Sequence, residues 1–374
     1  MARGDCGDAI HRTLLRLCYA PFGTARNDNY YSERHILMKR ITGVVLMVVV
    51  LVSACAAPGP TGVATVAPTT APTLTTKIRL AVTNVKFVRY LPVVMAVDML
   101  KQKGYDIEMV TAARFDLLPT MLTQGDAELA LVSPQGAWAA VAKGAPLVSL
   151  AAVFAPSWAI VTSDKVKECA DLAKYPVAFS STTGVQQAML FTYAKEHCPG
   201  TTPQILVLGD AAGRLAALEA GQIDAASVEV DDALKLNADK PNAFHTLIRA
   251  SRDFPNVQIA LLASTRDWAQ KNPQAVKDVI RAHLVAARQL SDHPDMLAAE
   301  MMKQLGYDAP TAKAATEAYL AEKIWDLNGG LTPEDIQLTL NLLQGINAVP
   351  PEVKASDVAD LSYLNAVLDE LGRR

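Results

Sequence analysis

Short apolar segments alternate with longer amphipathic ones from residue 77 onward. Apolar runs of this kind are typical of buried strands, and the segments between them have the spacing of helices. We expect strands at 78–82, 105–110, 129–132 and 147–154, and helices at about 92–103, 116–124 and 134–143. Strands separated by helices favour right-handed crossovers, so the pattern predicts an α/β fold with mostly parallel sheets.

The alternation begins again after Pro156 and then gives way to helices. We expect strands at 177–179, 205–208 and 225–228, with helices at about 184–197 and 212–220. Beyond Leu262 the pattern is almost entirely helical, and Asn272 and Thr332 each precede a proline, which favours a capped helix start at both points. A chain of 374 residues exceeds one ordinary core, which agrees with about two domains.

Polar and aromatic residues follow the carboxyl ends of the expected strands. In open α/β sheets, loops at this edge line the crevice that binds ligands. The candidate ligand-binding residues are Asn84, Phe87, Tyr90, Phe115, Ser133, Trp158, Ser180, Ser181, Thr182, Thr183 and Glu229. Thr182 and Thr183 also precede a helix, where free N–H groups favour an anion or a carbonyl oxygen. Simple helix capping is compatible with the same two hydroxyls.

Aromatic side chains outnumber arginines in these loops. Arg89 and Arg114 are the two arginine candidates, and a small inorganic anion would need convergent arginines or several free N–H groups. Stacking of a flat ring on an aromatic side chain contributes about 1–3 kcal/mol, by analogy with nucleic-acid bases. The balance favours a flat heteroaromatic ligand. We assign Trp138, which lies inside an expected helix, to the core.

Composition and charge exclude several classes of protein. The chain is 51% apolar and 20% charged, which excludes disorder for most of its length. Its net charge of -3 gives no basic footprint for a nucleic acid. The histidines belong to no metalloprotease or triad-like local signature, and no glycine-rich phosphate loop follows a strand. We therefore expect no catalytic residue, no metal and no cofactor.

The N-terminal segment has the pattern of a processing signal. The apolar run from Ile41 to Val52 is shorter than the roughly 20 residues that span a bilayer. It follows Met38-Lys39-Arg40 and precedes small residues, which is typical of a secretory signal. We expect residues 1–54 to be this signal segment, with Met38 as the true start. Residues 55–76, rich in Thr, Pro and Ala, are expected to form an extended tether.

Two of the five cysteines, Cys169 and Cys198, fall in the expected folded body. Outside the cytoplasm such a pair permits one disulfide, and two unpaired thiols agree equally well with the sequence. No cluster of metal-ligating residues surrounds either cysteine in the sequence, so neither indicates a metal site.

Several motifs resemble those of known families. Val52-Ser53-Ala54-Cys55 resembles the lipobox of bacterial lipoproteins, which implies that Cys55 is the lipidated first residue of the mature chain. The chain also resembles substrate-binding proteins of ATP-binding-cassette (ABC) importers in the order of several segments. These are 122–130, Ser133-Pro134, 178–184, 218–226 and the helix after Asn272-Pro273. The resemblance is to the group that binds nitrate, sulfonates and thiamine precursors.

This resemblance implies a two-lobed, periplasmic-binding-protein-like fold of type 2. The ligand would lie in the cleft between two α/β lobes joined by two crossing strands. Lobe 1 would comprise residues 77–159 and 263–374, including the C-terminal helices, and lobe 2 residues 160–262. The protein would be a monomer at the cell membrane, lipid-anchored on its extracytoplasmic face.

The resemblance also implies the function. The protein would capture a small molecule and deliver it to ABC permease and ATPase subunits, and among vitamin-type ligands we favour riboflavin. A sulfonate or nitrate-type anion is one alternative, and a thiamine-pyrimidine precursor, bound or converted, is another. One eukaryotic branch that makes the thiamine pyrimidine uses a Cys-rich iron motif. This sequence lacks that motif, so we expect a binder, not an enzyme.

Overall fold

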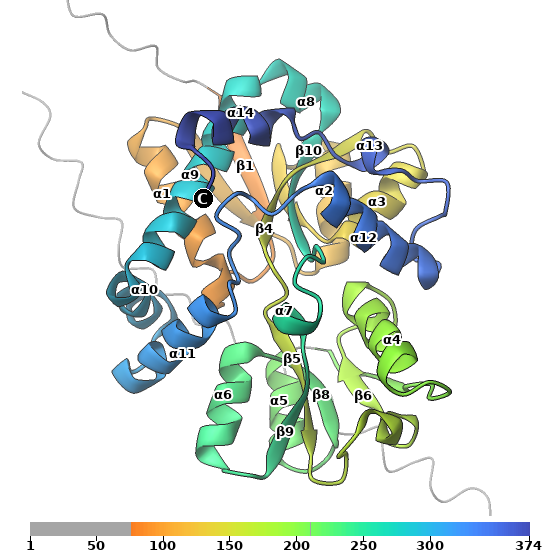
Figure 1. Cartoon of the computed structure of the whole chain (residues 1–374). Helices are drawn as coiled ribbons and strands as arrows, with labels where there is room; N and C mark the ends of the chain where they lie inside the picture. Colours follow the sequence, from red (N-terminus) through yellow and green to blue (C-terminus); the bar gives the residue numbers. More distant parts are fainter. Residues whose placement is uncertain (1–75, 210) are drawn as a thin grey trace, which may run out of the picture. The chain divides into compact units, whose positions relative to one another are not determined.

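The computed structural model describes residues 76–209 and 211–374 (Figure 1). The predicted signal segment, Cys55 and residues 55–75 of the predicted tether lie outside this part of the chain. None of the helices in the described ranges combines the length and the apolar character needed to cross a bilayer.

A first five-stranded sheet has the strand order β2-β1-β3-β10-β4. Its strands are β1 (Lys77–Val82), β2 (Asp106–Thr111), β3 (Leu129–Val132), β4 (Leu147–Phe154) and β10 (Ala260–Thr265). The helices between them are α1 (Leu91–Gln102), α2 (Leu118–Gln124) and α3 (Pro134–Ala142). Every residue of β3 and of β4 is buried, as expected for strands covered on both faces.

A second five-stranded sheet has the order β7-β6-β8-β5-β9. Its strands are β5 (Trp158–Ser163), β6 (Val177–Phe179), β7 (Ile205–Val207), β8 (Ala225–Glu229) and β9 (Phe244–Arg249). The helices that accompany it are α4 (Val185–His197), α5 (Ala211–Glu219), α6 (Val230–Asp239) and α7 (Ala250–Asp253). The chain passes from the first sheet to the second after β4 and returns after β9.

The prediction of mostly parallel sheets is only partly right. Strands β1, β2 and β3 pair in parallel, as do β6, β7 and β8. By contrast, β10 pairs antiparallel with β3 and β4, and β5 pairs antiparallel with β8 and β9. Both β5 and β10 enter their sheet from the other one. No crossover helix within a single sheet therefore forces them into parallel pairing.

The C-terminal part of the described chain is helical, as predicted. Its helices are α8 (Arg266–Lys271), α9 (Pro273–Asp292), α10 (Pro294–Glu300), a π-helical turn (Met301–Leu305), α11 (Ala309–Ala321), α12 (Pro333–Gly345), α13 (Ala355–Val358) and α14 (Ser362–Leu371). Helix α9 packs against α1 and α14, whereas α11 packs against α6 and α12 against α4 (Figure 1). Helices from the C-terminal part thus contact helices of the second sheet.

The two predicted proline-led helix starts occur with different caps. Thr332 caps α12 through its side chain, which accepts a hydrogen bond from the Asp335 backbone N–H at 3.1 Å. Asn272 precedes α9, but its side chain makes no cap bond and donates to the Trp268 carbonyl instead, at 2.9 Å. Proline in the first turn is therefore enough to begin α9.

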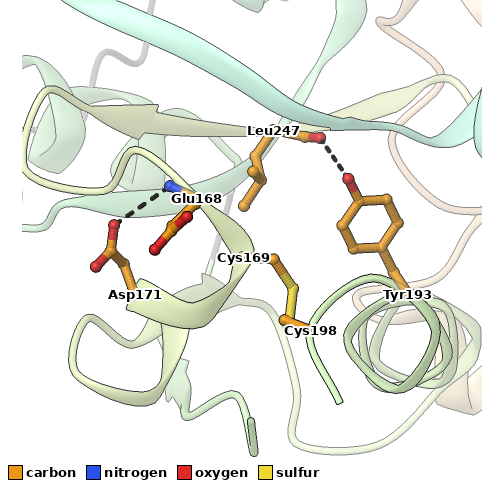
Figure 2. Close-up of a disulfide and its surroundings, with 6 residues drawn as sticks. All are labelled: Glu168, Cys169, Asp171, Tyr193, Cys198 and Leu247. Atoms are coloured by element: carbon orange, nitrogen blue, oxygen red, sulfur yellow. Dashed lines mark hydrogen bonds between the residues drawn. A yellow bond between two sulfur atoms is a disulfide. The ribbon is translucent and has the colours of Figure 1, made fainter.

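Cys169 and Cys198 are bonded to each other, with their Cα atoms 5.8 Å apart (Figure 2). The disulfide links a 3-10 turn (Cys169–Ala173) to the residue that ends α4. On the same helix, the Tyr193 hydroxyl donates to the Leu247 carbonyl of β9 at 3.4 Å. These contacts fix α4 and the loop before β6 to the body of the second sheet.

His283 is a buried titratable group on the inward face of α9. Its Nε2 lies 3.1 Å from the Val153 carbonyl of β4, and its Nδ1 has no hydrogen-bond partner within the described residues. Apolar side chains of the first sheet, α1 and α9 surround a void of ≈ 20 Å³ beside it. Burial lowers the pKa of His283 to about 4, so the imidazole is neutral in the folded protein at neutral pH.

Candidate functional site

A buried ion pair lies between a turn of the first sheet and a strand end of the second. Arg89 belongs to a 3-10 turn (Val88–Tyr90) that follows the loop after β1 and leads directly into α1. Glu229 ends β8 and is the N-cap residue of α6. Arg89 Nη1 pairs with the Glu229 carboxylate, and both side chains are only 12% exposed. The Ser157 hydroxyl donates to Glu229 Oε2 at 3.0 Å, so the carboxylate is held from two directions.

Aromatic rings enclose the guanidinium of Arg89. Its Cζ lies 4.4 Å from the ring centroid of Phe87, 5.2 Å from that of Tyr90 and 5.4 Å from that of Phe154, distances at which a cation is attracted to the ring face. Trp325 Nε1 donates to the Arg89 carbonyl at 3.0 Å. Burial by itself would lower the pKa of Arg89, but Glu229, Tyr90 and Tyr319 more than offset this and raise it. Arg89 is therefore a permanent cation.

The first turn of α6 adds two more carboxylates beside the ion pair. Asp231 accepts hydrogen bonds from the hydroxyls of Tyr307 and Tyr319, the latter at 3.1 Å. Burial, together with repulsion from Asp231 and Glu229, raises the pKa of Asp232 to about 7. Burial is also the first cause of the raised pKa values of Tyr307 and Tyr319, so both hydroxyls stay protonated and donate.

Three buried polar atoms at this place have no hydrogen-bond partner within the described residues, and one of them, Arg89 Nη1, is in ion-pair contact with Glu229. The other two are the hydroxyl of Tyr90 and Nε1 of Trp158, whose residues are 1% and 2% exposed. Trp158 faces Glu229 in the antiparallel register of β5 and β8. Buried polar groups in native proteins are almost always paired, so each unpaired group needs an explanation. A bound solute that supplies the missing partners is one such explanation.

The structure brings together four of the residues that the sequence predicted, namely Phe87, Tyr90, Trp158 and Glu229. Asn84 is exposed, and its Oδ1 accepts from the Lys86 backbone N–H at 3.0 Å in a local turn. Phe115 is half-buried against the core of the first sheet. Ser133 precedes α3 as its N-cap residue without a side-chain cap bond.

The loop from Ser180 to Thr183 is exposed and lies between β6 and α4. The Ser181 hydroxyl donates to the Thr183 carbonyl at 2.7 Å, and Gln187 Nε2 donates to the Ser181 carbonyl at 2.7 Å. Gly184, not Thr182 or Thr183, is the N-cap residue of α4, and α4 has no side-chain cap bond. Capping therefore does not account for the two threonines. Gly184 has a φ of +142°, and a Cβ there would lie 3.1 Å from Gln135 Nε2 of α3.

Sequence reasoning assigned no role to several residues of this site. Asp231 lies in the strand-end loop that begins at Glu229 and that the sequence places at the crevice, but neither it nor Asp232 was named as a ligand-binding residue. Tyr319 lies in α11, with Tyr307 in the loop before this helix and Trp325 in the loop after it, and only tertiary packing brings them to α6 and Arg89. Trp138 is fully buried and donates to Ser149 Oγ at 3.2 Å, which confirms its assignment to the core.

The fold is that of the periplasmic binding proteins. The structure of the aliphatic sulphonate-binding protein of Escherichia coli is 18% identical to this chain, with a TM-score of 0.59, and the match covers 75% of this chain and 91% of that one. The nitrate-binding protein of Synechocystis is 12% identical, with a TM-score of 0.63, over 80% and 90% of the two chains. A ligand-binding component of an ABC-type import system from Staphylococcus aureus is 14% identical, with a TM-score of 0.63, over 78% and 98%.

The chain belongs to the NMT1/THI5-like family, whose model matches residues 97–297, more than half of the sequence. The matched segment runs from α1 to α10 and so includes both sheets from β2 onward. A comparison with curated protein sequences finds no match. Within the described residues, no group of three or more His, Cys, Asp or Glu side chains is placed to hold a metal ion.

Proposed function

We propose that this protein is a solute-binding component of an ABC importer, which captures a small molecule between two lobes and delivers it unchanged to the permease and ATPase subunits. The main support for this proposal is the group formed by Arg89, Glu229, Tyr90 and Trp158. It joins elements of both sheets, and it contains buried polar atoms whose partners a solute would supply. The family and the fold support the same class of protein.

The mechanism that we propose is a closing cleft. Residues 77–159 with 263–374 form lobe 1, and residues 160–262 form lobe 2. The chain crosses between the sheets in the links between β4 and β5 and between β9 and β10, a few residues before these bounds, and in this mechanism the two links act as the hinge. A ligand that contacts both lobes only in the closed form shifts the open–closed equilibrium by its difference in affinity for the two forms. Arg89–Glu229 and Asp231–Tyr319 are contacts of the closed form in this mechanism, since each joins the two lobes.

The aromatic surroundings favour a flat heteroaromatic ligand, and riboflavin is the vitamin that we propose first. Phe87, Tyr90 and Trp158 offer ring surface and unpaired polar atoms in one place. The loop of Ser180 to Thr183, with Ser133, Asn84 and Phe115, supplies further contacts from neighbouring strand ends. A sulfonate or nitrate-type anion is the second candidate, because two of the similar structures are named for such ligands.

The proposal also includes the cellular location of the protein. A monomer lipidated at Cys55 would be held on the extracytoplasmic face of the cell membrane, because two or more acyl chains anchor stably. A thiamine-pyrimidine precursor remains an alternative ligand, as the name of the family suggests. Recovery of the bound compound with its mass unchanged would separate a binder from an enzyme that converts it.

Trp158→Phe tests the site directly. The variant keeps a ring but removes the unpaired Nε1 donor. The test ligand is the compound that stabilises the wild type best in a thermal-shift panel of riboflavin, pyrimidines and sulfonates. We expect its affinity to fall roughly two- to tenfold, because the variant loses one hydrogen bond. Isothermal titration measures the change.

Trp138→Phe is the matched control for this experiment. It removes an indole that is equally buried but already bonded to Ser149. It should lower the melting temperature without changing ligand affinity. Equal affinities in wild type and Trp158→Phe would remove Trp158 from the site.

A further inference from the structure

The guanidinium of Arg89 is already committed to a partner inside the protein. It pairs with Glu229, which the Ser157 hydroxyl also holds, and three aromatic rings surround it. Arg114, the other arginine near a strand end, pairs with Asp116 on the surface and is 71% exposed. Of the two arginines that could recognise an anion here, one is thus neutralised by Glu229 and the other lies outside the buried group.

The charge balance around Arg89 is negative. Glu229 and Asp231 stand against this single arginine at the junction of β8 and α6, and Asp232, whose pKa is about 7, adds part of a negative charge at neutral pH. Tyrosine hydroxyls occupy both oxygens of Asp231. Of the buried atoms without a hydrogen-bond partner, those of Tyr90 and Trp158 belong to neutral side chains, and the third, Arg89 Nη1, faces the Glu229 carboxylate. An oxyanion placed here would meet carboxylates, and the arginine among them is already paired with Glu229, which costs affinity.

We propose that Glu229 determines the charge selectivity of the site. By holding Arg89 it excludes oxyanions such as sulfonates and nitrate, and it leaves the site to neutral or positively charged flat solutes with an acceptor for Trp158 Nε1 or Tyr90. The inference rests on the proposed function, because it takes this group to be the place where a solute binds. It separates this chain from the similar structures that are named for sulfonate and nitrate.

Glu229→Gln makes the inference testable. Glutamine has nearly the same shape and still accepts from Ser157, but it carries no charge. Arg89 would then form charge-assisted hydrogen bonds with an added oxyanion. We expect the affinity for methanesulfonate or nitrate, measured by isothermal titration, to rise about tenfold or more over the wild type. The double variant Arg89→Met/Glu229→Gln should lose this gain.

Glu128→Gln is the matched control. Glu128 pairs with Arg79 near the other end of β1, where both side chains are also partly buried. The control frees an arginine by the same chemistry outside the proposed site, and it should leave anion affinity at the wild-type value. A gain in this control equal to that in Glu229→Gln would show that any released arginine binds anions, and this would overturn the inference.

Two further results would also overturn the inference. One is a wild type that binds methanesulfonate or nitrate as tightly as Glu229→Gln does. The other is a folded Glu229→Gln, checked by circular dichroism, that shows no gain. If Glu229→Gln does not fold, the ligand selectivity of the wild type tests the inference instead. Micromolar oxyanion binding contradicts the inference, and binding of a neutral or cationic ligand with oxyanions excluded supports it.

Failure of the proposed function gives a different result from failure of this inference. If the protein is not a solute binder, no compound in the panel binds the wild type, whatever Glu229→Gln does. If only the inference fails, the wild type binds an oxyanion, and the protein is still a solute binder.

Discussion

Replacing Arg89 with methionine is expected to lower the free energy of unfolding of the closed, ligand-saturated protein by about 3–5 kcal/mol. Methionine fills a similar volume between the aromatic rings, but it leaves the Glu229 carboxylate buried without its cation, and removing one partner of a buried ion pair has a cost of this size. Urea denaturation followed by circular dichroism measures the change. The additional substitution Glu229→Gln should recover part of the loss, because it removes the unpaired charge.

Arg114→Met is the control for this prediction, since it breaks the exposed pair with Asp116 and should change stability little. Equal stabilities for the wild type and Arg89→Met, both at saturating ligand, would mean that the Arg89–Glu229 pair is not formed in the closed protein. The closed arrangement described above would then be wrong.

Acid is expected to destabilise the protein through His283. In the unfolded chain this histidine takes up a proton near pH 6.5, whereas in the folded protein burial lowers its pKa to about 4. Stability is therefore fully present above about pH 6.5 and is lost as the pH falls toward 4, because only the unfolded state binds the proton in that range. The difference corresponds to about 3 kcal/mol, at about 1.4 kcal/mol for each pKa unit.

His283→Gln should remove this part of the acid sensitivity while keeping a donor for the Val153 carbonyl. His245→Gln is the control, because His245 lies on the surface beside Asp164 and is half exposed. Denaturation curves between pH 4 and 8 measure the slopes. An identical decline in wild type and His283→Gln below pH 6.5 would contradict the prediction.

Local sequence pattern was enough to predict much of the fold. Strands β3 and β4 have the predicted bounds, because each is an apolar run, broken in β4 by Ser149 alone, between a glycine- or proline-marked turn and the next element. Strands β5, β9 and β10 were not predicted. Each pairs with strands far away in the sequence, and β5 and β10 come from the other sheet, so their pairing depends on tertiary contacts that no short window contains.

The candidate site was predictable in part, for a similar reason. The strand-end argument selected Tyr90, Trp158 and Glu229, because the end of a strand is visible in the sequence. It also counted Arg89 as a cation available to a ligand. The neutralising partner lies 140 positions later, at the end of a strand in the other sheet. Tyr319 reaches Asp231 from α11 and Tyr307 from the loop before it, both after the last strand, and no local pattern in the sequence indicates these contacts.

Small-angle X-ray scattering with and without a bound solute tests the central claim, that two lobes close around a small molecule. The account predicts that the ligand-free protein in solution is more expanded than the closed structure, and that saturating ligand reduces its radius of gyration. A radius of gyration that stays unchanged at saturation, confirmed by titration in the same sample, would contradict the account.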